Sequence, residues 1–155
     1  MFADMKDSVT VHMNASPERV WALVSDVTRI GEFSPETFEA EWLDGASGPG
    51  PGVRFRGHVR RNGRGPVYWT TCKVVDCVPN TRFSFGVVMK DRAGITWGYD
   101  LAPSGSGTDV TEFFELSNSL PMRLYWALAG KARGRTNRRG MQTTLERIKA
   151  VVEAG

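Results

Sequence analysis

The sequence predicts an α+β fold in which a curved antiparallel sheet packs against one long C-terminal helix. Residues 8–34 carry a strand pattern that passes directly into helical patterns, residues 37–117 alternate between polar and apolar side chains, and the remainder returns to a helical period. Consecutive strands joined by short turns pair antiparallel. A helix with one apolar stripe is a natural cover for the apolar face of such a sheet.

The N-terminal region predicts one strand followed by a helix. Val9, Val11 and Met13 alternate with polar residues, which is the period of a half-buried strand. Ser16 is a favourable N-cap and Pro17 suits the first helical turn, so a helix is expected to begin here. The apolar residues that follow at helical spacing are Val20, Leu23, Val24 and Val27.

A second short helix, with the sequence TRIGEF, is expected after a cap at Asp26 or Thr28, and Pro35 ends it. Residues 1–7 are expected to be a loose N-terminal tail. The whole chain, residues 1–155, is expected to form a single ligand-binding domain.

Six strand-like runs follow, and turn signals separate them. NGRG at residues 62–65 and KDRAG at 90–94 are two of the expected turns. In the third run, Lys73 prefers solvent, which turns its neighbours Cys72 and Val74 inward. The same parity turns Trp69 outward and Tyr68 inward. The six runs span residues 38–45, 53–61, 67–78, 82–89, 95–103 and 109–116.

The last segment predicts a long amphipathic helix. Ser119 can cap it, and Pro121 suits its first turn. Three glycines between residues 130 and 140 predict a kink or a break in this helix. An apolar stripe at helical spacing consists of Met141, Leu145, Ile148 and Val152.

Length and composition restrict the class of protein. A chain of 155 residues with 41% hydrophobic and 24% charged residues is typical of one folded domain. No apolar run approaches the roughly 20 residues of a membrane helix, and the N-terminus has no signal-peptide pattern. We therefore expect a cytoplasmic protein without stable membrane insertion. Cys72 and Cys77 are expected to be free thiols, and no metal site and no cofactor are expected.

The basic stretch at residues 52–65 raises the question of nucleic-acid binding. Its arginines alternate strictly with apolar residues, which predicts a strand with a solvated basic face. Sheets that read RNA carry aromatic residues on the exposed face, whereas Phe55 has the opposite parity to Arg54 and Arg56. The pattern favours an ordinary solvated strand, and no nucleic-acid partner is expected.

Several segments together resemble a known family. They are ASPERVWALVSDV, EFSPE, EWLDG, GVRFRGH, WTTCKVVD and NRRGMQTTLERI. In these segments and in the order of its elements, the chain resembles the START-like, polyketide cyclase/dehydrase (SRPBCC) superfamily, and its small single-domain actinobacterial members in particular, over residues 8–153. The resemblance implies a helix-grip fold: a curved seven-stranded antiparallel sheet wrapped around a long C-terminal helix, with two short helices after the first strand. It also implies a deep pocket for an apolar or polycyclic ligand.

Two residues of the predicted inner face are candidate acid/base groups. Glu112 shares parity with Val110 and Phe114, so it is expected to point inward, where burial would raise its pKa. In the alternative, a bulge or a nearby arginine makes Glu112 a surface residue or a member of an ion pair. Tyr99 has a hydroxyl that can meet a ligand oxygen.

The expected ligand-binding residues combine the inward side chains of the strands with residues from the helices. Glu36 is expected near the pocket mouth, and a cap or turn role for it is an equal alternative. The expected set is Phe33, Glu36, Phe55, Val59, Cys72, Phe85, Val87, Trp97, Tyr99, Glu112, Phe114, Tyr125, Trp126 and Met141.

Two functions fit this site. The first is binding of a hydrophobic small molecule, lipid-like or polyketide-like, in a cavity between sheet and helix. The second is a polyketide aromatase/cyclase; family cyclases often use a pocket arginine, whereas the arginines here lie mostly at outward parity. The basic run at residues 131–139 is expected to be a solvated segment beside the entrance, or to attract acidic ligand groups, a carrier protein or anionic lipid headgroups. Both a monomer and a homodimer are compatible with the sequence.

Overall fold

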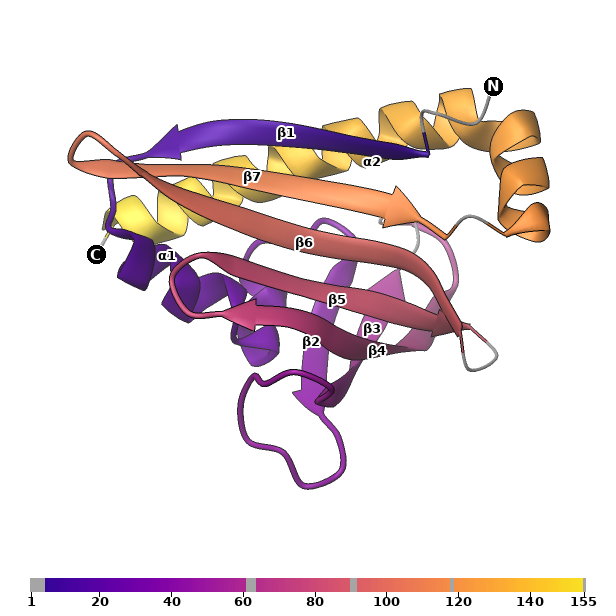
Figure 1. The fold of residues 1–155 in the computed structure, drawn as a ribbon, viewed down its shortest axis with the longest axis horizontal. Helices are drawn as coiled ribbons and strands as arrows, with labels where there is room; N and C mark the ends of the chain where they lie inside the picture. Colours follow the sequence, from indigo (N-terminus) through magenta and orange to yellow (C-terminus); the bar gives the residue numbers. More distant parts are fainter. Residues whose placement is uncertain (1–4, 61–63, 90–91, 118, 155) are drawn as a thin grey trace.

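The computed structural model describes residues 5–60, 64–89, 92–117 and 119–154. It confirms the predicted helix-grip fold, with a curved antiparallel sheet, two short helices after the first strand and one long C-terminal helix (Figure 1). The helices are α1 (Pro17–Val24), the 3₁₀ helix η1 (Val27–Glu32) and α2 (Leu120–Ala154). The strands are β1 (Lys6–Met13), β2 (Thr37–Trp42), β3 (Arg54–Arg60), β4 (Val67–Val78), β5 (Arg82–Met89), β6 (Arg92–Ser104) and β7 (Gly107–Leu116).

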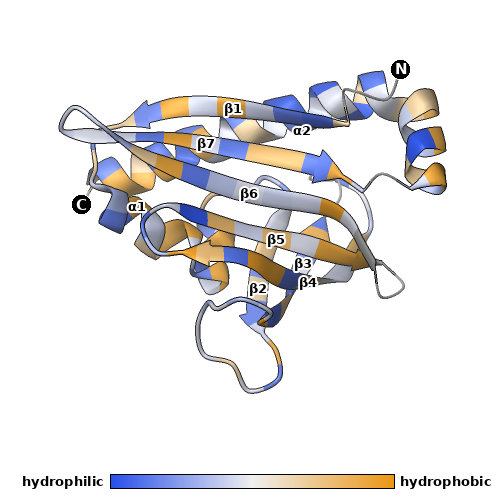
Figure 2. Ribbon diagram, in the orientation of Figure 1, coloured by the Kyte–Doolittle hydropathy of each residue, from blue (hydrophilic) through white to orange (hydrophobic). Residues whose placement is uncertain are grey.

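The seven strands form a meander that β1 completes. Their order in the sheet is β1-β7-β6-β5-β4-β3-β2, and every neighbouring pair is antiparallel. Hydrophobic and hydrophilic residues alternate along the strands (Figure 2), so one face of the sheet is apolar. α2 returns behind the sheet and packs along β1, while η1 packs against β2 at the other edge (Figure 1).

α1 begins at the predicted cap. The Ser16 hydroxyl accepts a hydrogen bond from the Arg19 backbone N–H at 3.2 Å. We expect Ser16→Ala to lower the free energy of unfolding by about 0.5–2 kcal/mol, because an N–H at the helix end loses its acceptor. Urea unfolding measures this difference. Ser16→Asp, which keeps an acceptor, should retain most of the stability, and an unchanged stability of Ser16→Ala would contradict the capping role.

The apolar stripe of α2 forms the centre of the core. Met141 is 1% exposed, and Leu145 and Ile148 are fully buried. A kink or a break was predicted, and the break does not occur, since α2 is one helix from Leu120 to Ala154. Its first part is steeply inclined to the remainder (Figure 1), so the helix is kinked but continuous.

β4 has the predicted orientation over its first part. Cys72 and Val74 are buried, whereas Lys73 between them is exposed. The register with β5 then shifts between Val74 and Cys77, and this irregularity places Cys77 opposite the buried Phe83. Strict alternation would put the two cysteines on opposite faces; the shift turns both toward the core, and both are free thiols.

The N-terminal strand starts earlier than expected. β1 begins at Lys6, inside the segment expected to be a loose tail, and Met5 before it is only 7% exposed. The Leu116 N–H donates a hydrogen bond to the Met5 carbonyl at 2.8 Å, which extends the pairing with β7. The expected turns at residues 62–65 and 90–94 lie partly outside the described residues.

The outer face of β3 carries aromatic as well as basic side chains. His58 stacks on Trp69 of β4 with 4.1 Å between ring centroids. The ring centroid of Phe38 of β2 lies 4.4 Å from that of His58. The premise that this face lacks aromatic residues is therefore wrong, because they come from the neighbouring strands. Arg54 and Arg56 pair with Asp44 and Glu41, so acidic side chains are also present beside these aromatic rings.

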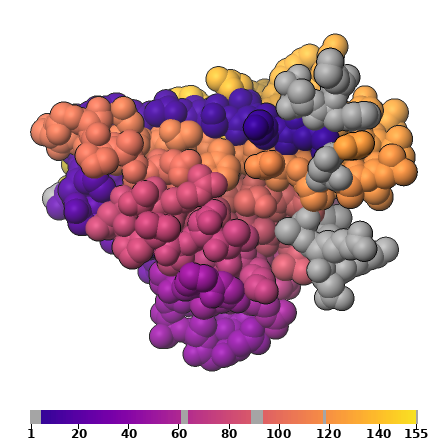
Figure 3. Space-filling view, viewed as in Figure 1, coloured from indigo at the N-terminus to yellow at the C-terminus, as the bar shows by residue number. Residues whose placement is uncertain are grey.

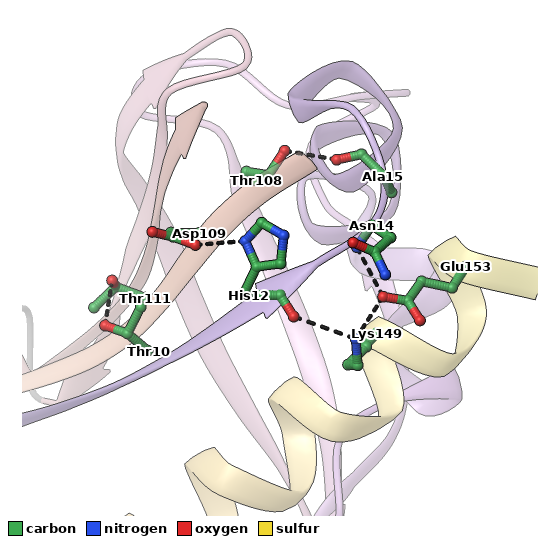
Figure 4. A network of polar contacts seen from close by, with 9 residues as sticks. All are labelled: Thr10, His12, Asn14, Ala15, Thr108, Asp109, Thr111, Lys149 and Glu153. Carbon is green, nitrogen blue, oxygen red and sulfur yellow. Dashed lines mark hydrogen bonds and ion pairs between the residues drawn. The ribbon is translucent and has the colours of Figure 1, made fainter. Parts of the chain in front are cut away.

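Polar contacts tie the C-terminal end of α2 to β1 and the residue that follows it (Figure 4). The Glu153 carboxylate accepts a hydrogen bond from the Asn14 N–H at 2.7 Å and pairs with Lys149 at 2.6 Å. Lys149 also donates to the His12 carbonyl at 3.3 Å. The hydrogen bond from the Asn14 N–H lowers the pKa of the Glu153 carboxyl most, and the hydrogen bond from Lys149 lowers it further. These contacts fix the end of α2 against the edge of the sheet.

Candidate ligand cavity

A cavity of about 260 Å³ lies between the inner face of the sheet and α2. Strands β3 to β7 supply one wall, and the segment around the end of η1 together with the middle of α2 supplies the other. The wall from the sheet is mainly aromatic and aliphatic. Its largest side chains are Phe55, Tyr68, Phe85, Trp97 and Tyr99.

Most of the residues expected to bind a ligand lie in the wall of this cavity. They come from five strands, the segment after η1 and α2, and the structure brings them together although they are far apart in the sequence. They are Glu36, Phe55, Val59, Cys72, Phe85, Val87, Trp97, Tyr99, Glu112 and Met141.

Four expected residues lie outside the cavity wall. Phe33 is 2% exposed and packs edge-on against Tyr99 with 6.4 Å between ring centroids, so it supports the wall from behind. Phe114 packs against Trp126 with 6.0 Å between ring centroids. Tyr125 is 37% exposed. For Tyr125 and Trp126 the reason is the position of α2, whose residues reach the cavity only from residue 133 onward.

The expected set omitted thirteen residues of the wall, most of them polar residues or glycines. On α2, Asn137 and Arg133 continue the buried stripe toward the N-terminus at four-residue spacing from Met141, and this period was a usable signal. The omitted residues are Ile30, Ser34, Pro35, Thr37, Gly57, Tyr68, Thr70, Ile95, Arg133, Thr136, Asn137, Gly140 and Thr144.

Tyr99 and Glu112 stand side by side in the wall. They are directly opposite each other on β6 and β7, and each is 6% exposed. Within the described residues, Glu112 Oε2 is buried without a hydrogen-bond partner. The described structure therefore places Glu112 in the cavity wall, and not at the surface, where one alternative had put it.

The environment of this pair favours neutral side chains. Burial raises the pKa of the Glu112 carboxyl well above its ordinary value, because a carboxylate loses its hydration in an apolar wall. Burial, and then the adjacent Glu112, also raises the pKa of the Tyr99 hydroxyl. In their neutral forms, both groups can donate a hydrogen bond to an oxygen atom in the cavity.

An ion pair marks the place where the cavity meets the surface. Arg133 Nη1 lies 3.7 Å from Glu36 Oε1, and the two side chains are 23% and 26% exposed. Both line the cavity, as does Tyr68, which is 39% exposed. Arg133 is a pocket arginine that the parity of the strands did not indicate, because it comes from α2.

Cys72 is a structural part of the wall. Burial raises the pKa of its thiol to about 12, so the thiol remains protonated at neutral pH. Because the thiolate is the nucleophilic form, Cys72 is a small apolar wall residue and not a nucleophile.

A family model described as "Polyketide cyclase / dehydrase and lipid transport" matches residues 5–153. The chain belongs to this family. Its membership confirms the resemblance found in the sequence, and the two classes of function in the family description both concern hydrophobic molecules. A comparison of this family member with curated proteins found no match in sequence.

Solved structures share the fold of this family member. A polyketide-cyclase-like protein of Corynebacterium glutamicum is 26% identical, with a TM-score of 0.56 and coverage of 99% of this chain and 90% of that one. A protein of Nitrosomonas europaea is 14% identical, with a TM-score of 0.70 and coverage of 99% and 97%. The di-domain ARO/CYC protein StfQ from the steffimycin biosynthetic pathway is 14% identical, with a TM-score of 0.68; the match covers 97% of this chain and 51% of StfQ.

Proposed function

We propose that this protein binds a hydrophobic small molecule, lipid-like or polyketide-like, in the cavity between the sheet and α2. The observation that carries the proposal is the oxygen of the buried Glu112 carboxyl that has no partner in the described structure. Buried polar atoms are normally hydrogen-bonded, and a ligand would supply the missing partner. Removal of the ligand's apolar surface from water would contribute about 25 cal/mol per Å².

The polar groups of the wall favour a particular kind of ligand. Neutral Glu112 and Tyr99 are hydrogen-bond donors, so they would orient a molecule through a carbonyl or hydroxyl oxygen. The volume of about 260 Å³ is close to the lower limit of roughly 300 Å³ for small-molecule sites. It suits a small ring system, or one end of a longer molecule that passes out between Glu36 and Arg133.

A polyketide cyclase is the second candidate, because Arg133 places a cation in the same cavity as Glu112 and Tyr99. In that function, Glu112 or Tyr99 would transfer a proton during the aldol closure and dehydration of a poly-β-ketone, and a carrier protein would present the substrate. Glu112→Gln separates the two candidates, since it keeps the shape and the hydrogen bonding but cannot exchange a proton. It should abolish turnover by a cyclase and only change the affinity of a binding protein. Glu115→Gln, exposed on the same strand, is the matched control.

Native mass spectrometry of protein purified from cells tests ligand binding directly. We expect a species heavier than the chain by the mass of one small molecule, which extraction with organic solvent removes. Protein at the mass of the chain alone, together with no binding of apolar compounds in solution, would contradict the proposal.

Gly140 offers a way to close the cavity from the helix. A Cβ at this position meets only Pro35 Cγ, at 4.0 Å. Gly140→Phe should place a ring in the cavity and weaken binding of the neutral dye N-phenyl-1-naphthylamine about tenfold or more, which equals a loss of at least about 1.4 kcal/mol. Gly140→Ala is the control: it should keep dye binding and stabilise α2 by about 1 kcal/mol. Equal affinity in both variants would exclude this cavity as the binding site.

A further inference from the structure

The first half of α2 combines exposed apolar side chains with a run of cations, and Lys131, Arg135 and Arg139 of this run have no ion pair in the described structure. From residue 116 to residue 145 the sequence contains no acidic residue and six basic ones. Residues 45–75 are equally one-sided in sequence, but there Arg54 and Arg56 pair with Asp44 and Glu41. In the first half of α2, three exposed leucines lie in the first turns, and five of the six basic residues follow from residue 131 onward.

The apolar residues lie on one side of the first turns of α2. Leu120, Leu124 and Leu128 follow at four-residue spacing and are 68%, 56% and 90% exposed. Tyr125 beside them is 37% exposed. On another side of these turns, Trp126 packs against Phe114 of β7. The helix is thus held to the sheet through Trp126 while its leucines face solvent.

The basic residues continue the same side of the helix. Lys131 follows Leu128 by three residues, and Arg135 and Arg139 follow at four-residue spacing, so these side chains lie in line with the leucines. All three are exposed, and the described structure contains no ion pair for any of them. Arg133 and Arg138 differ, because they pair with Glu36 and Asp7.

We propose that this side of α2 docks on a membrane surface rich in anionic phospholipid. The orange first part of α2 stands at one end of the molecule, beyond the sheet, where a flat surface can reach it (Figures 1 and 3). The leucines would enter the boundary between headgroups and acyl chains, and the cations behind them would lie at the level of the phosphates. The described part of the chain has no helix that could cross a bilayer, so the contact is peripheral.

A membrane fits this surface better than an acidic soluble protein does. An acidic protein would compensate Lys131, Arg135 and Arg139 but would leave the neighbouring leucines without an apolar partner. A bilayer offers both chemistries in the order in which the helix presents them, with apolar turns first and basic turns next. Docking does not depend on what the cavity holds, so it stands or falls separately from the proposed ligand binding.

Vesicle flotation of the full chain tests the proposal. We expect the protein to float with vesicles of phosphatidylcholine and phosphatidylglycerol in equal parts, to bind vesicles of phosphatidylcholine alone much more weakly, and to be released by salt. Gly140→Phe, which fills the cavity, should bind vesicles as the unchanged protein does. This variant therefore separates membrane docking from ligand binding.

Two sets of substitutions divide the surface into its apolar and basic parts. Leu124→Ser with Leu128→Ser should lower the vesicle partition coefficient about tenfold or more, because the apolar contact is lost. Replacement of the three cations by glutamine should lower it about a hundredfold at low salt, at about 1 kcal/mol for each charge. The control is Val75→Ser with Val78→Ser, two residues of β4 that are 52% and 50% exposed. Circular dichroism verifies the fold, and Leu128→Ser alone serves if the double variant does not fold.

Three results would overturn the proposal. One is equal binding to neutral and anionic vesicles, or no binding to either. Another is salt-sensitive binding to polyglutamate without binding to vesicles, which would assign the surface to an acidic polypeptide. The third is a dimer in light scattering that Leu124→Ser and Leu128→Ser dissociate, without vesicle binding, which would assign it to a second copy of the chain.

Discussion

Leu145→Ala is expected to lower the free energy of unfolding by about 2–5 kcal/mol. Leu145 is fully buried at the centre of the stripe through which α2 packs on the sheet. Its removal leaves a space that the surrounding side chains fill only in part, so lost transfer energy and lost packing both contribute. Denaturant unfolding followed by circular dichroism measures the change.

The same helix provides a matched control. Leu128 is 90% exposed, so Leu128→Ala removes the same atoms without opening a cavity and should change stability by less than about 0.5 kcal/mol. Similar losses for the two variants would mean that α2 does not pack on the sheet through the face described above.

Glu112→Gln is expected to change how stability depends on pH. Burial raises the pKa of Glu112 well above that of an exposed glutamic acid, which is about 4.3. Between these two values the folded protein holds one proton more than the unfolded chain, so the stability from this group is complete below about pH 4 and decreases as the pH rises. The decrease is about 1.4 kcal/mol for each pH unit until the raised pKa is passed.

Glutamine does not titrate, so the free energy of unfolding of Glu112→Gln should not show this decrease with rising pH. Unfolding free energies of the two proteins, measured in urea from pH 5 to pH 8, should therefore diverge in favour of the variant as the pH rises. Glu115→Gln controls for the other titrating groups, because Glu115 is exposed on the same strand. Parallel curves for the unchanged protein and Glu112→Gln would show that Glu112 is ionised in the folded state.

The architecture of the sheet followed from its alternating pattern. Strand parity correctly turned Glu112, Phe85 and Cys72 inward, because a sheet with one apolar face admits a single orientation for each regular strand. Parity failed where a strand was irregular: the register shift in β4 redirected Cys77. The parity of one strand also does not tell which residues of the neighbouring strands lie beside it, so Phe38 and Trp69 were not placed beside the arginines of β3.

The cavity was harder to predict than the sheet because it depends on where the helix lies. Tyr125 and Trp126 were expected in the wall, but the bend of α2 takes the first part of the helix away from it. Arg133 and Asn137 enter the wall instead, and polar residues on a buried stripe are easily interpreted as solvent-facing. The pairing of Arg133 with Glu36 joins residues almost a hundred positions apart, which no local pattern indicates.

The pairing of β1 with β7 sets the order in which the protein can be completed. Thr10 and Thr111 contact each other across 101 positions, so β1 can pair only after β7 has been synthesised. Each of the strands β3 to β7 can pair with the strand before it as it emerges, but the inner face of the sheet remains exposed to water until α2 is synthesised. Distant pairings of this kind slow folding. A nascent chain halted before Leu120 would therefore expose the apolar inner face of its sheet to chaperones.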